Sequence, residues 1–508
     1  MARYKPESIM LNISKPSGDL KQKTVKGIFW SYLSFIGGKG LTFLTTIVLA
    51  RLLLPEQFGI IGYCLIAIQY LDILNSAGID SSLIARRENL EEAANAAFIA
   101  NILLGLISFG LTWIIAPAVA EFFKTEEIIP VLRVLGLSLP ISGLGLVPDA
   151  LIQRQLQFRT KLVPDMSRNF VKGLVSIVLA VLGMGVWSLV WGQIAGVLTG
   201  TVLAWMLAGW RPSWRFNPEA TRAIASYGYY IVLIEVAGAF RSNVDYLLVG
   251  RILGAAALGY YTMAFRIPEL LIRSLNNVIG SVSLPTLAIT QSDQGKLRSF
   301  YFGYLRYLSI FVAPIAVGLA MTSALFIPLF LSDTWKFAVI PTALISLALG
   351  ISALGYVPGV LYKAISRPEI LNRLSLVKIP LAVFILWYST RWGINGVAAG
   401  QIAMSLISVS LDISIANYIM QYKISDLLKA IVPAVSSVLV MAIALFLVEF
   451  IPASDILKLT LKVLIGALVY FGMLWLVARE IILNGMRMAQ TTFTKFDRTA
   501  SVEAHLND

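Results

Sequence analysis

The chain has 508 residues, of which 57% are hydrophobic and 14% are charged, with a formal charge of +13 and a mean hydropathy of +0.78. An ordinary soluble domain is about 45 to 50% apolar and about 25% charged, so the composition indicates a polytopic membrane protein. Cys64 and His505 are the single cysteine and the single histidine, which excludes an intrachain disulfide and a metal site built from these residue types. We expect no cofactor.

Apolar windows of about 20 residues predict an all-α protein with fourteen transmembrane helices. The predicted spans are 27–50, 57–78, 94–117, 128–150, 163–183, 186–208, 223–249, 257–284, 300–328, 337–361, 368–389, 394–417, 428–451 and 458–481. The segment 322–336 is either a helix end or a short re-entrant piece.

Lysine and arginine fall mostly in the predicted loops on one side of the membrane. The other side has mainly Arg51, Lys124, Arg251, Lys336, Arg391 and Lys458. Basic loops stay in the cytoplasm, so we expect both termini to be cytoplasmic. This placement explains the basic charge without nucleic acid. The outer loops, such as 183–187 and 389–394, are too short for an external catalytic domain. We therefore do not expect the protein to be an enzyme.

Three sequence blocks recur in order about 200 residues apart. ARLLLPEQFG from Ala50 matches GRILGAAALG from Gly250, ISGLGLVPDAL from Ile141 matches ISALGYVPGVL from Ile351, and WGQIA from Trp191 matches AGQIA from Ala399. The pattern predicts two six-helix bundles in parallel orientation, related by a pseudo-twofold axis along the membrane normal.

The repeat divides the chain into six predicted segments. These are a cytoplasmic N-terminal segment (1–26), the first bundle (27–208), a cytoplasmic linker (209–222), the second bundle (223–421), helices 13 and 14 (422–482) and a cytoplasmic tail (483–508).

Cations within the spans are the first candidates for a functional site. Lys39, in the stretch SFIGGKGLTF, lies near the middle of the first span, from which a lysine does not readily reach the interface. Arg241 lies two residues beyond the position that corresponds to Lys39 in the second bundle. Arg266, Glu269 and Arg273 share one face of helix 8. We expect a cationic cavity formed by Lys39, Arg241, Arg266 and Arg273; alternatives are an Arg266–Glu269 pair and a boundary position for Arg273.

The spans also contain a few acids, namely Asp72, Asp149, Glu235, Asp245 and Asp412. A carboxylate in a low-dielectric site can exchange a coupling proton or bind sodium, and Asp72, Asp149 and Asp245 are the candidates. Asp149 belongs to one half only, because its counterpart is Gly359. The alternative is ion pairing, for example between Arg241 and Asp245.

Four motifs in order carry a resemblance to a known family: LARLLLPEQFG, GIDSSLIAR, PDALIQRQLQFR and DYLLVGRILGAAALGYYTMAFRIPE. Together they resemble bacterial polysaccharide flippases of the MOP superfamily, in the Wzx-type branch similar to colanic-acid and teichuronic-acid exporters. The resemblance covers roughly residues 24 to 480. It implies that a lipid-linked oligosaccharide on polyprenyl pyrophosphate is flipped to the outer leaflet by alternating access, without ATP hydrolysis. It also implies a location in the bacterial cytoplasmic (inner) membrane. The chain also has no GxxxxGK[ST] phosphate loop.

The implied partners are the lipid-linked oligosaccharide, membrane lipids, a coupling ion, and polysaccharide polymerase and glycosyltransferase machinery. A multidrug or organic-cation antiporter of the same superfamily is the first alternative, although a cation exporter is expected to have a net acidic cavity. A membrane glycosyltransferase or polymerase is the second, and the short outer loops argue against it.

Overall fold

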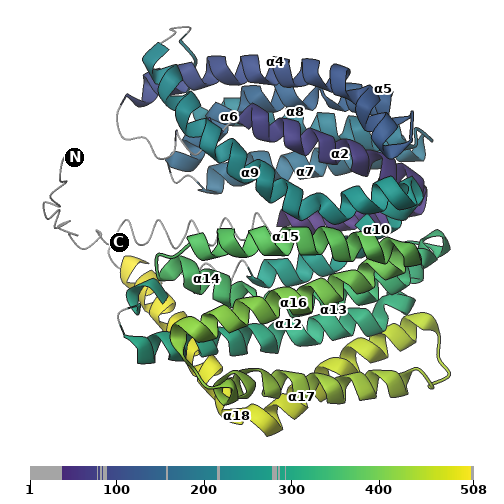
Figure 1. Cartoon of the computed structure of the whole chain (residues 1–508), viewed down its shortest axis with the longest axis vertical. Helices are drawn as coiled ribbons and strands as arrows, with labels where there is room; N and C mark the ends of the chain where they lie inside the picture. Colours follow the sequence, from purple (N-terminus) through teal and green to yellow (C-terminus); the bar gives the residue numbers. More distant parts are fainter. Residues whose placement is uncertain are drawn as a thin grey trace, which may run out of the picture. The chain divides into compact units, whose positions relative to one another are not determined.

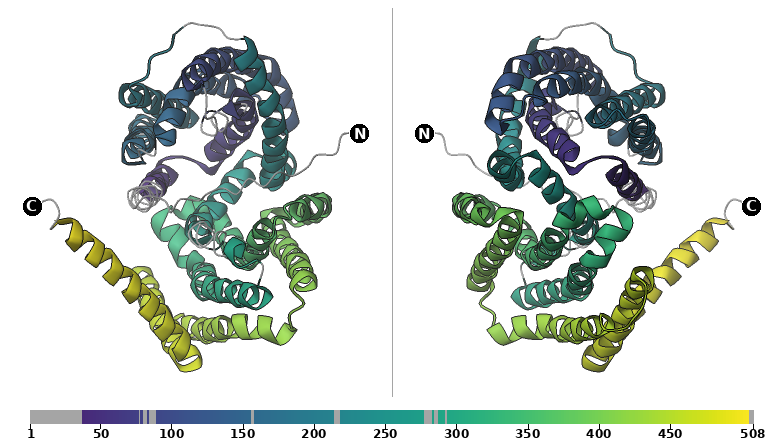
Figure 2. Two further views of the ribbon diagram at one scale, coloured as in Figure 1. Left: turned by 90° about the vertical axis from the view of Figure 1, so that its left-hand side faces the viewer. Right: turned by 90° about the vertical axis from the view of Figure 1, so that its right-hand side faces the viewer.

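The computed structural model describes residues 37–76, 78–79, 83, 89–155, 158–213, 218–276, 283, 287–291 and 293–504. The predicted N-terminal segment 1–26 and the first ten residues of the first predicted span lie outside these ranges. The described residues form helices joined by turns, without a strand among them (Figure 1 and Figure 2). Contacts divide the chain into unit 1 (Met1–Leu53 with Tyr63–Phe240) and unit 2 (Leu54–Gly62 with Arg241–Asp508).

Unit 1 is built from long apolar helices. They are a helix over residues 37–52, most of α2 (Pro55–Ser76), α4 (Leu90–Phe123), α5 (Ile128–Leu135), α6 (Ser138–Arg154), α7 (Phe158–Val181), α8 (Val186–Ala208) and the larger part of α9 (Pro218–Leu253). Helices α7 and α8 pack closely because α8 presents glycines to α7. A Cβ atom at Gly192 would lie 1.9 Å from Ser176 Oγ, so a larger residue there would push the two helices apart.

Unit 2 contains the remaining helices. They are α10 (Ala255–Pro268), the π-helical turn η1 (Glu269–Arg273), α12 (Gln294–Phe330), the 3-10 turn η2 (Asp333–Ala338), α13 (Val339–Leu354), α14 (Tyr356–Ala364), α15 (Glu369–Ser389), the 3-10 turn η3 (Thr390–Trp392), α16 (Gly393–Met420), α17 (Ile424–Val448) and α18 (Asp455–Ala504). Helices α17 and α18 pack on α12 around a buried cluster that includes Ile310, Met441 and Tyr470. The segment 322–336 proves to be a helix end followed by a 3-10 turn.

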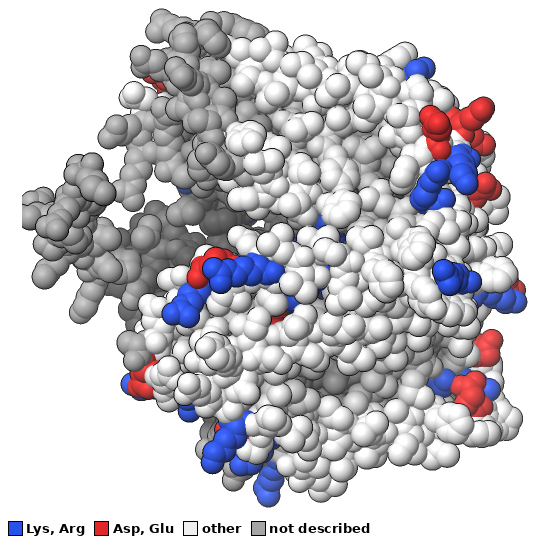
Figure 3. All heavy atoms as spheres, in the orientation of Figure 1, with Lys and Arg blue, Asp and Glu red and all other residues white. Residues whose placement is uncertain are grey.

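The described surface is that of a membrane protein. Large apolar side chains are exposed along α17, among them Leu439, Ile443 and Phe446. On the face drawn in Figure 3, charged side chains gather toward the ends of the helices and the surface between them is largely uncharged. An exposed apolar surface of this extent is stable only when lipid covers it.

The all-α membrane fold predicted from the sequence is therefore confirmed. Every predicted span includes described helix, and the described parts of the spans are helical apart from short turns. Within the described ranges, nine segments are long and apolar enough to cross a membrane, with α15 and α16 counted together. Helix α7 is not among them because its apolar part carries Asp165, Arg168 and Lys172. The number of fourteen spans thus stays a prediction.

Helices α2 and α10 cross at two glycines that belong to the predicted repeat. A Cβ atom at Gly59 would lie 1.9 Å from the carbonyl oxygen of Ala255, and one at Gly259 would lie 1.8 Å from that of Pro55. At the sequence offset of 200, Gly59 corresponds to Gly259 and Pro55 to Ala255. The two contacts are therefore reciprocal, as a local twofold axis requires.

Candidate functional site: a charged cavity in unit 2

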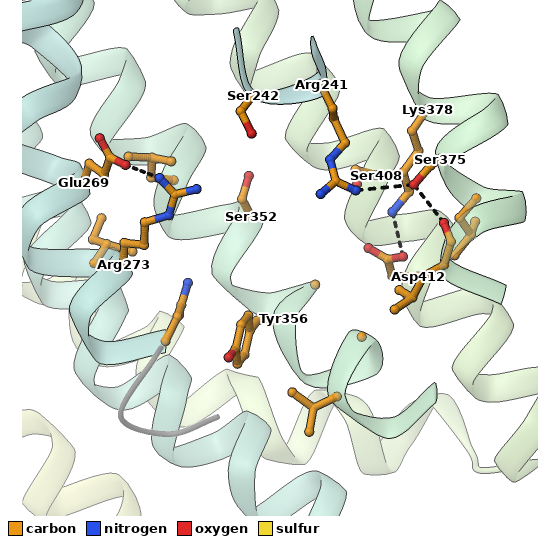
Figure 4. Close-up of a pocket in the computed structure, with 18 of the residues that line it drawn as sticks. Arg241, Ser242, Glu269, Arg273, Ser352, Tyr356, Ser375, Lys378, Ser408 and Asp412 are labelled. Carbon is orange, nitrogen blue, oxygen red and sulfur yellow. Dashed lines mark hydrogen bonds and ion pairs between the residues drawn. The ribbon is translucent and has the colours of Figure 1, made fainter. Parts of the chain in front are cut away.

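Unit 2 encloses a cavity of about 570 Å³, within the size range of small-molecule sites. Helices α9, α10, α13, α14, α15 and α16 and the turn η1 contribute to its wall. Its charged lining residues are Arg241, Asp245, Glu269, Arg273, Lys363, Lys378 and Asp412, so four cations face three carboxylates. Figure 4 shows most of these groups around the open space.

A short ion pair joins α15 to α16 at the cavity wall. Lys378 Nζ lies 2.6 Å from Asp412 Oδ1, and the two side chains are 18% and 9% exposed. The Tyr362 hydroxyl donates to the main-chain oxygen of Asp412 at 2.6 Å. A Cβ atom at position 355 would lie 2.9 Å from Asp412 Oδ2, so Gly355 leaves the room that the carboxylate occupies.

Arg241 lies near this pair and has a neutral partner. Its Nη1 donates to Ser375 Oγ at 3.4 Å (Figure 4). Within the described residues Arg241 forms no ion pair, so the alternative Arg241–Asp245 pair is not formed. Asp245, with only 5% of its surface exposed, instead accepts hydrogen bonds from the Tyr261 hydroxyl at 3.1 Å and from Gln401 Nε2 at 2.9 Å.

A second ion pair lies on the π-helical turn η1. Pro268, which has no N–H, immediately precedes this turn. Glu269 pairs with Arg273, and both side chains line the cavity (Figure 4). Arg266 is not among the lining residues; its guanidinium carbon lies 5.9 Å from the centre of the Phe58 ring.

Hydroxyl groups occupy much of the remaining wall. The lining residues with hydroxyls that Figure 4 labels are Ser242, Ser352, Tyr356, Ser375 and Ser408. Hydroxyls both donate and accept hydrogen bonds, as do the hydroxyls of a saccharide. The cavity therefore combines groups that suit an oxyanion with groups that suit a sugar.

The other predicted site residues lie in unit 1. Lys39 is on the helix over residues 37–52, with its side chain at the surface of that unit. Asp72 on α2 accepts a hydrogen bond from Ser142 Oγ at 3.3 Å. Asp149 on α6 pairs with Lys161 at 2.5 Å. Of the seven predicted residues, the cavity brings together Arg241, Arg273 and Asp245.

Sequence reasoning missed Lys363 and Lys378 as cavity residues. Lys378 lies at the middle of the predicted span 368–389, so the argument that singled out Lys39 also applies to it. Lys363 is harder to recognise, because it lies just beyond a predicted span, where a loop lysine facing water is ordinary. Its place in the wall depends on how α14 packs.

A bundle of apolar helices around a charged, hydroxyl-lined cavity is the architecture of a membrane transporter. The chain belongs to the polysaccharide biosynthesis protein family, which matches residues 48–340. This confirms the family resemblance that the four sequence motifs indicate.

Two curated relatives extend over most of the chain. The succinoglycan biosynthesis transport protein ExoT of Rhizobium meliloti (strain 1021) is 24% identical over 488 residues, which is 92% of this chain and 96% of that protein. The lipopolysaccharide biosynthesis protein WzxC of Escherichia coli (strain K12) is 25% identical over 404 residues, or 77% of this chain and 80% of that protein.

Solved structures share the fold at low sequence identity. The lipid II flippase MurJ in an inward closed conformation aligns with a TM-score of 0.72 at 14% identity, covering 90% of this chain and 100% of that one. An inward-facing multidrug resistance MATE transporter of the MOP superfamily aligns with a TM-score of 0.60 at 16% identity, covering 75% and 95%. The fold of the MOP superfamily is thus confirmed.

Proposed function

We propose that the protein translocates a polyprenyl-pyrophosphate-linked oligosaccharide across the cytoplasmic membrane for the synthesis of a surface polysaccharide. The observation that carries this proposal is the cavity of unit 2, in which cations outnumber carboxylates and serine and tyrosine hydroxyls line part of the wall between them. The names of the relatives, which include a succinoglycan transport protein and a lipopolysaccharide biosynthesis protein, support it.

The chemistry of the substrate fits such a cavity. A pyrophosphate diester carries two negative charges that the bilayer interior does not solvate, and cations in a polar cavity replace the lost water. Arginine binds phosphate oxygens through two parallel hydrogen bonds, whereas lysine acts as a point charge. Arg241 and Arg273 are the cavity residues suited to the first role, and Lys363 and Lys378 to the second.

In this proposal the transport cycle is alternating access, driven without ATP. Both termini lie in the cytoplasm, and the partners of the protein are polysaccharide polymerase and glycosyltransferase machinery. Lys39 is a further cation for the substrate in unit 1. Asp72, Asp149 and Asp245 are the candidate sites of a coupling proton or sodium ion, although the Asp149–Lys161 pair also supports a structural role for Asp149.

A second candidate function is export of organic cations or drugs. It is favoured by the similarity in fold to a MATE transporter and by the three carboxylates in the cavity, Asp245, Glu269 and Asp412. Two of the three are already neutralised by Arg273 and Lys378. An incoming organic cation would therefore meet a cavity of net positive charge, which disfavours this function.

Deletion of the gene and complementation with the full chain distinguish the two functions. We expect the deletion strain to lose one surface polysaccharide and to accumulate its lipid-linked unit in the inner leaflet, and the full chain to restore export. Intact polysaccharide export together with reduced drug tolerance would instead identify a drug exporter.

A further inference from the structure

The Lys378–Asp412 pair joins two cavity groups that would compete with a bound anion. Both residues line the cavity, and the carboxylate already holds the ammonium at 2.6 Å. A phosphate oxygen that approaches Lys378 therefore competes with Asp412 for the charge of the ammonium group. The Asp412 carboxylate therefore occupies the position beside Lys378 that a substrate anion would take.

The two partners differ in how firmly they are held. The main chain at Asp412 is anchored by the Tyr362 hydroxyl at 2.6 Å, and its Oδ2 lies against Gly355. Lys378 ends in a flexible four-carbon stem, which can turn its ammonium group without moving a helix. Lys378 is therefore the partner that can exchange one anion for another.

A released Lys378 would not act alone. It lies one helical turn beyond Ser375 on α15, and Ser375 Oγ accepts the hydrogen bond from Arg241 at 3.4 Å. Figure 4 shows Arg241 and Lys378 beside each other at the cavity wall. An oxyanion at this wall would meet one guanidinium and one ammonium group, which are two cations for the two negative charges of a diphosphate diester.

Among the three carboxylates that line the cavity, Asp412 is the one that is bonded to Lys378. The other charged groups facing the cavity are Arg241 and Asp245 from α9, Glu269 and Arg273 from η1, and Lys363 from α14, with Tyr362 also bonded to the Asp412 main chain. Glu269 is paired with Arg273, and Asp245 is bonded to Tyr261 and Gln401. Neither of these acids holds Lys378.

We propose that Lys378 and Arg241 form the diphosphate subsite, and that Lys378 alternates between Asp412 in the empty protein and the diphosphate in the loaded protein. The inference rests on the proposed function and adds a role for Asp412. An unpaired lysine is expensive in a low-dielectric interior, so Asp412 neutralises it while the empty protein returns. The pair thus weakens binding and permits turnover.

The test uses the purified full chain and dimethyl diphosphate, a soluble diphosphate diester whose charge is constant near neutral pH. Asp412→Asn removes the competing charge with little change of shape and should bind this probe about tenfold more tightly than the unchanged protein, the effect of about one charge-assisted contact. Lys378→Gln should bind it about tenfold more weakly. Asp333→Asn, which breaks a surface Lys336–Asp333 pair of 3.1 Å, is the matched control and should bind normally.

Transport separates this role from a purely structural one. Asp412→Asn should lower both the half-saturating substrate concentration and the maximal rate, because substrate binds more tightly and the empty protein returns more slowly. Lys378→Gln, which should raise the half-saturating substrate concentration because the substrate loses a cation, provides a second test if Asp412→Asn does not fold.

Binding by Asp412→Asn or by Lys378→Gln at the affinity of the unchanged protein would overturn the inference. So would the absence of any diphosphate binding by the unchanged protein. Neither result would overturn the proposed function if the full chain still restores polysaccharide export in the deletion strain.

Discussion

The polar interiors of the two units differ although their sequences repeat. Ser142 in unit 1 and Ser352 in unit 2 stand at an offset of 210. Ser142 bonds to Asp72, whereas Ser352 contacts Ser405 at 2.7 Å and lines the cavity. Asp149, paired with Lys161, corresponds to Gly359, which also lines the cavity. At these positions the repeat keeps a serine hydroxyl but replaces a paired carboxylate with a glycine that lines the cavity of unit 2.

The reciprocal glycine crossing is the part of the repeat with the largest expected effect. Gly259→Ala places a Cβ atom against the Pro55 carbonyl, which lies 1.8 Å from that position. We expect a loss of stability of about 1–3 kcal/mol or more from overpacking, measured as a lower melting temperature in detergent. Gly303→Ala on α12 is the control, because no described atom beyond its own stretch of helix lies within 4 Å of its Cβ position, and it should melt at or above the original temperature. Equal melting by both variants would contradict the close crossing.

Gly359→Asp makes unit 2 resemble unit 1 at the position where their charges differ. The nearest described atom to its Cβ position is Leu371 Cδ2 at 3.8 Å, so a Cβ atom fits without a clash. A carboxylate about 8 Å from a bound phosphate costs about 2 kcal/mol at an effective dielectric constant of about 20. We therefore expect polysaccharide export at limiting substrate to fall about thirtyfold. Gly359→Ala should export normally; a similar loss with alanine would indicate a packing effect and not charge.

Asn101→Leu tests whether the polar interior of unit 1 is structural. The Asn101 side chain is fully buried, and its amide nitrogen and oxygen have no hydrogen-bond partner among the residues that the structure describes. An unsatisfied buried amide is costly, so an apolar side chain of similar volume should stabilise the protein by about 1 kcal/mol. The test measures the melting temperature of Asn101→Leu and the polysaccharide export that it supports. Loss of export with intact melting would mean that Asn101 binds something during transport.

The smallest effect concerns the contact between the α17–α18 hairpin and α12. Lys462, a buried lysine, bonds to Glu449 at 2.5 Å and to the main-chain oxygen of Met321 at 3.1 Å. Its hydrogen bond holds the pKa of the Glu449 carboxyl below the ordinary value. The stabilisation is therefore fully present above that ordinary value and is lost as the pH falls through the lowered one. Because Glu449 is 51% exposed, we expect well under about 1 kcal/mol.

Melting temperatures of the unchanged protein and of Glu449→Gln, compared between neutral and acidic pH, measure this contribution. The glutamine variant should melt lower than the unchanged protein at neutral pH, and the difference should vanish in acid. A difference that persists in acid would assign the effect to packing.

Most of the fold and part of the candidate site can be predicted from the sequence. Helix positions follow from hydropathy, and the repeat predicts the Gly59 and Gly259 correspondence, because both are properties of residue spacing. Arg241, Arg273 and Asp245 can be predicted, because a charged residue within a membrane span is costly and therefore indicates a polar site. The ion-pair partners in the cavity are not predicted. Asp412 pairs with Lys378 from another helix, which depends on tertiary packing. Glu269 pairs with Arg273 along the π-helical turn η1.

Transport in reconstituted vesicles tests the proposed function most directly. The purified chain is placed in liposomes that contain a polyprenyl-pyrophosphate-linked oligosaccharide, and the fraction of sugar exposed to an external lectin is followed in time. We expect the protein to accelerate the exposure of the sugar to the lectin. We expect Arg241→Gln to slow this exposure by about tenfold, the effect of one charge-assisted contact with the pyrophosphate. Exposure at the rate of protein-free liposomes, with the protein folded and inserted, would contradict the proposed function.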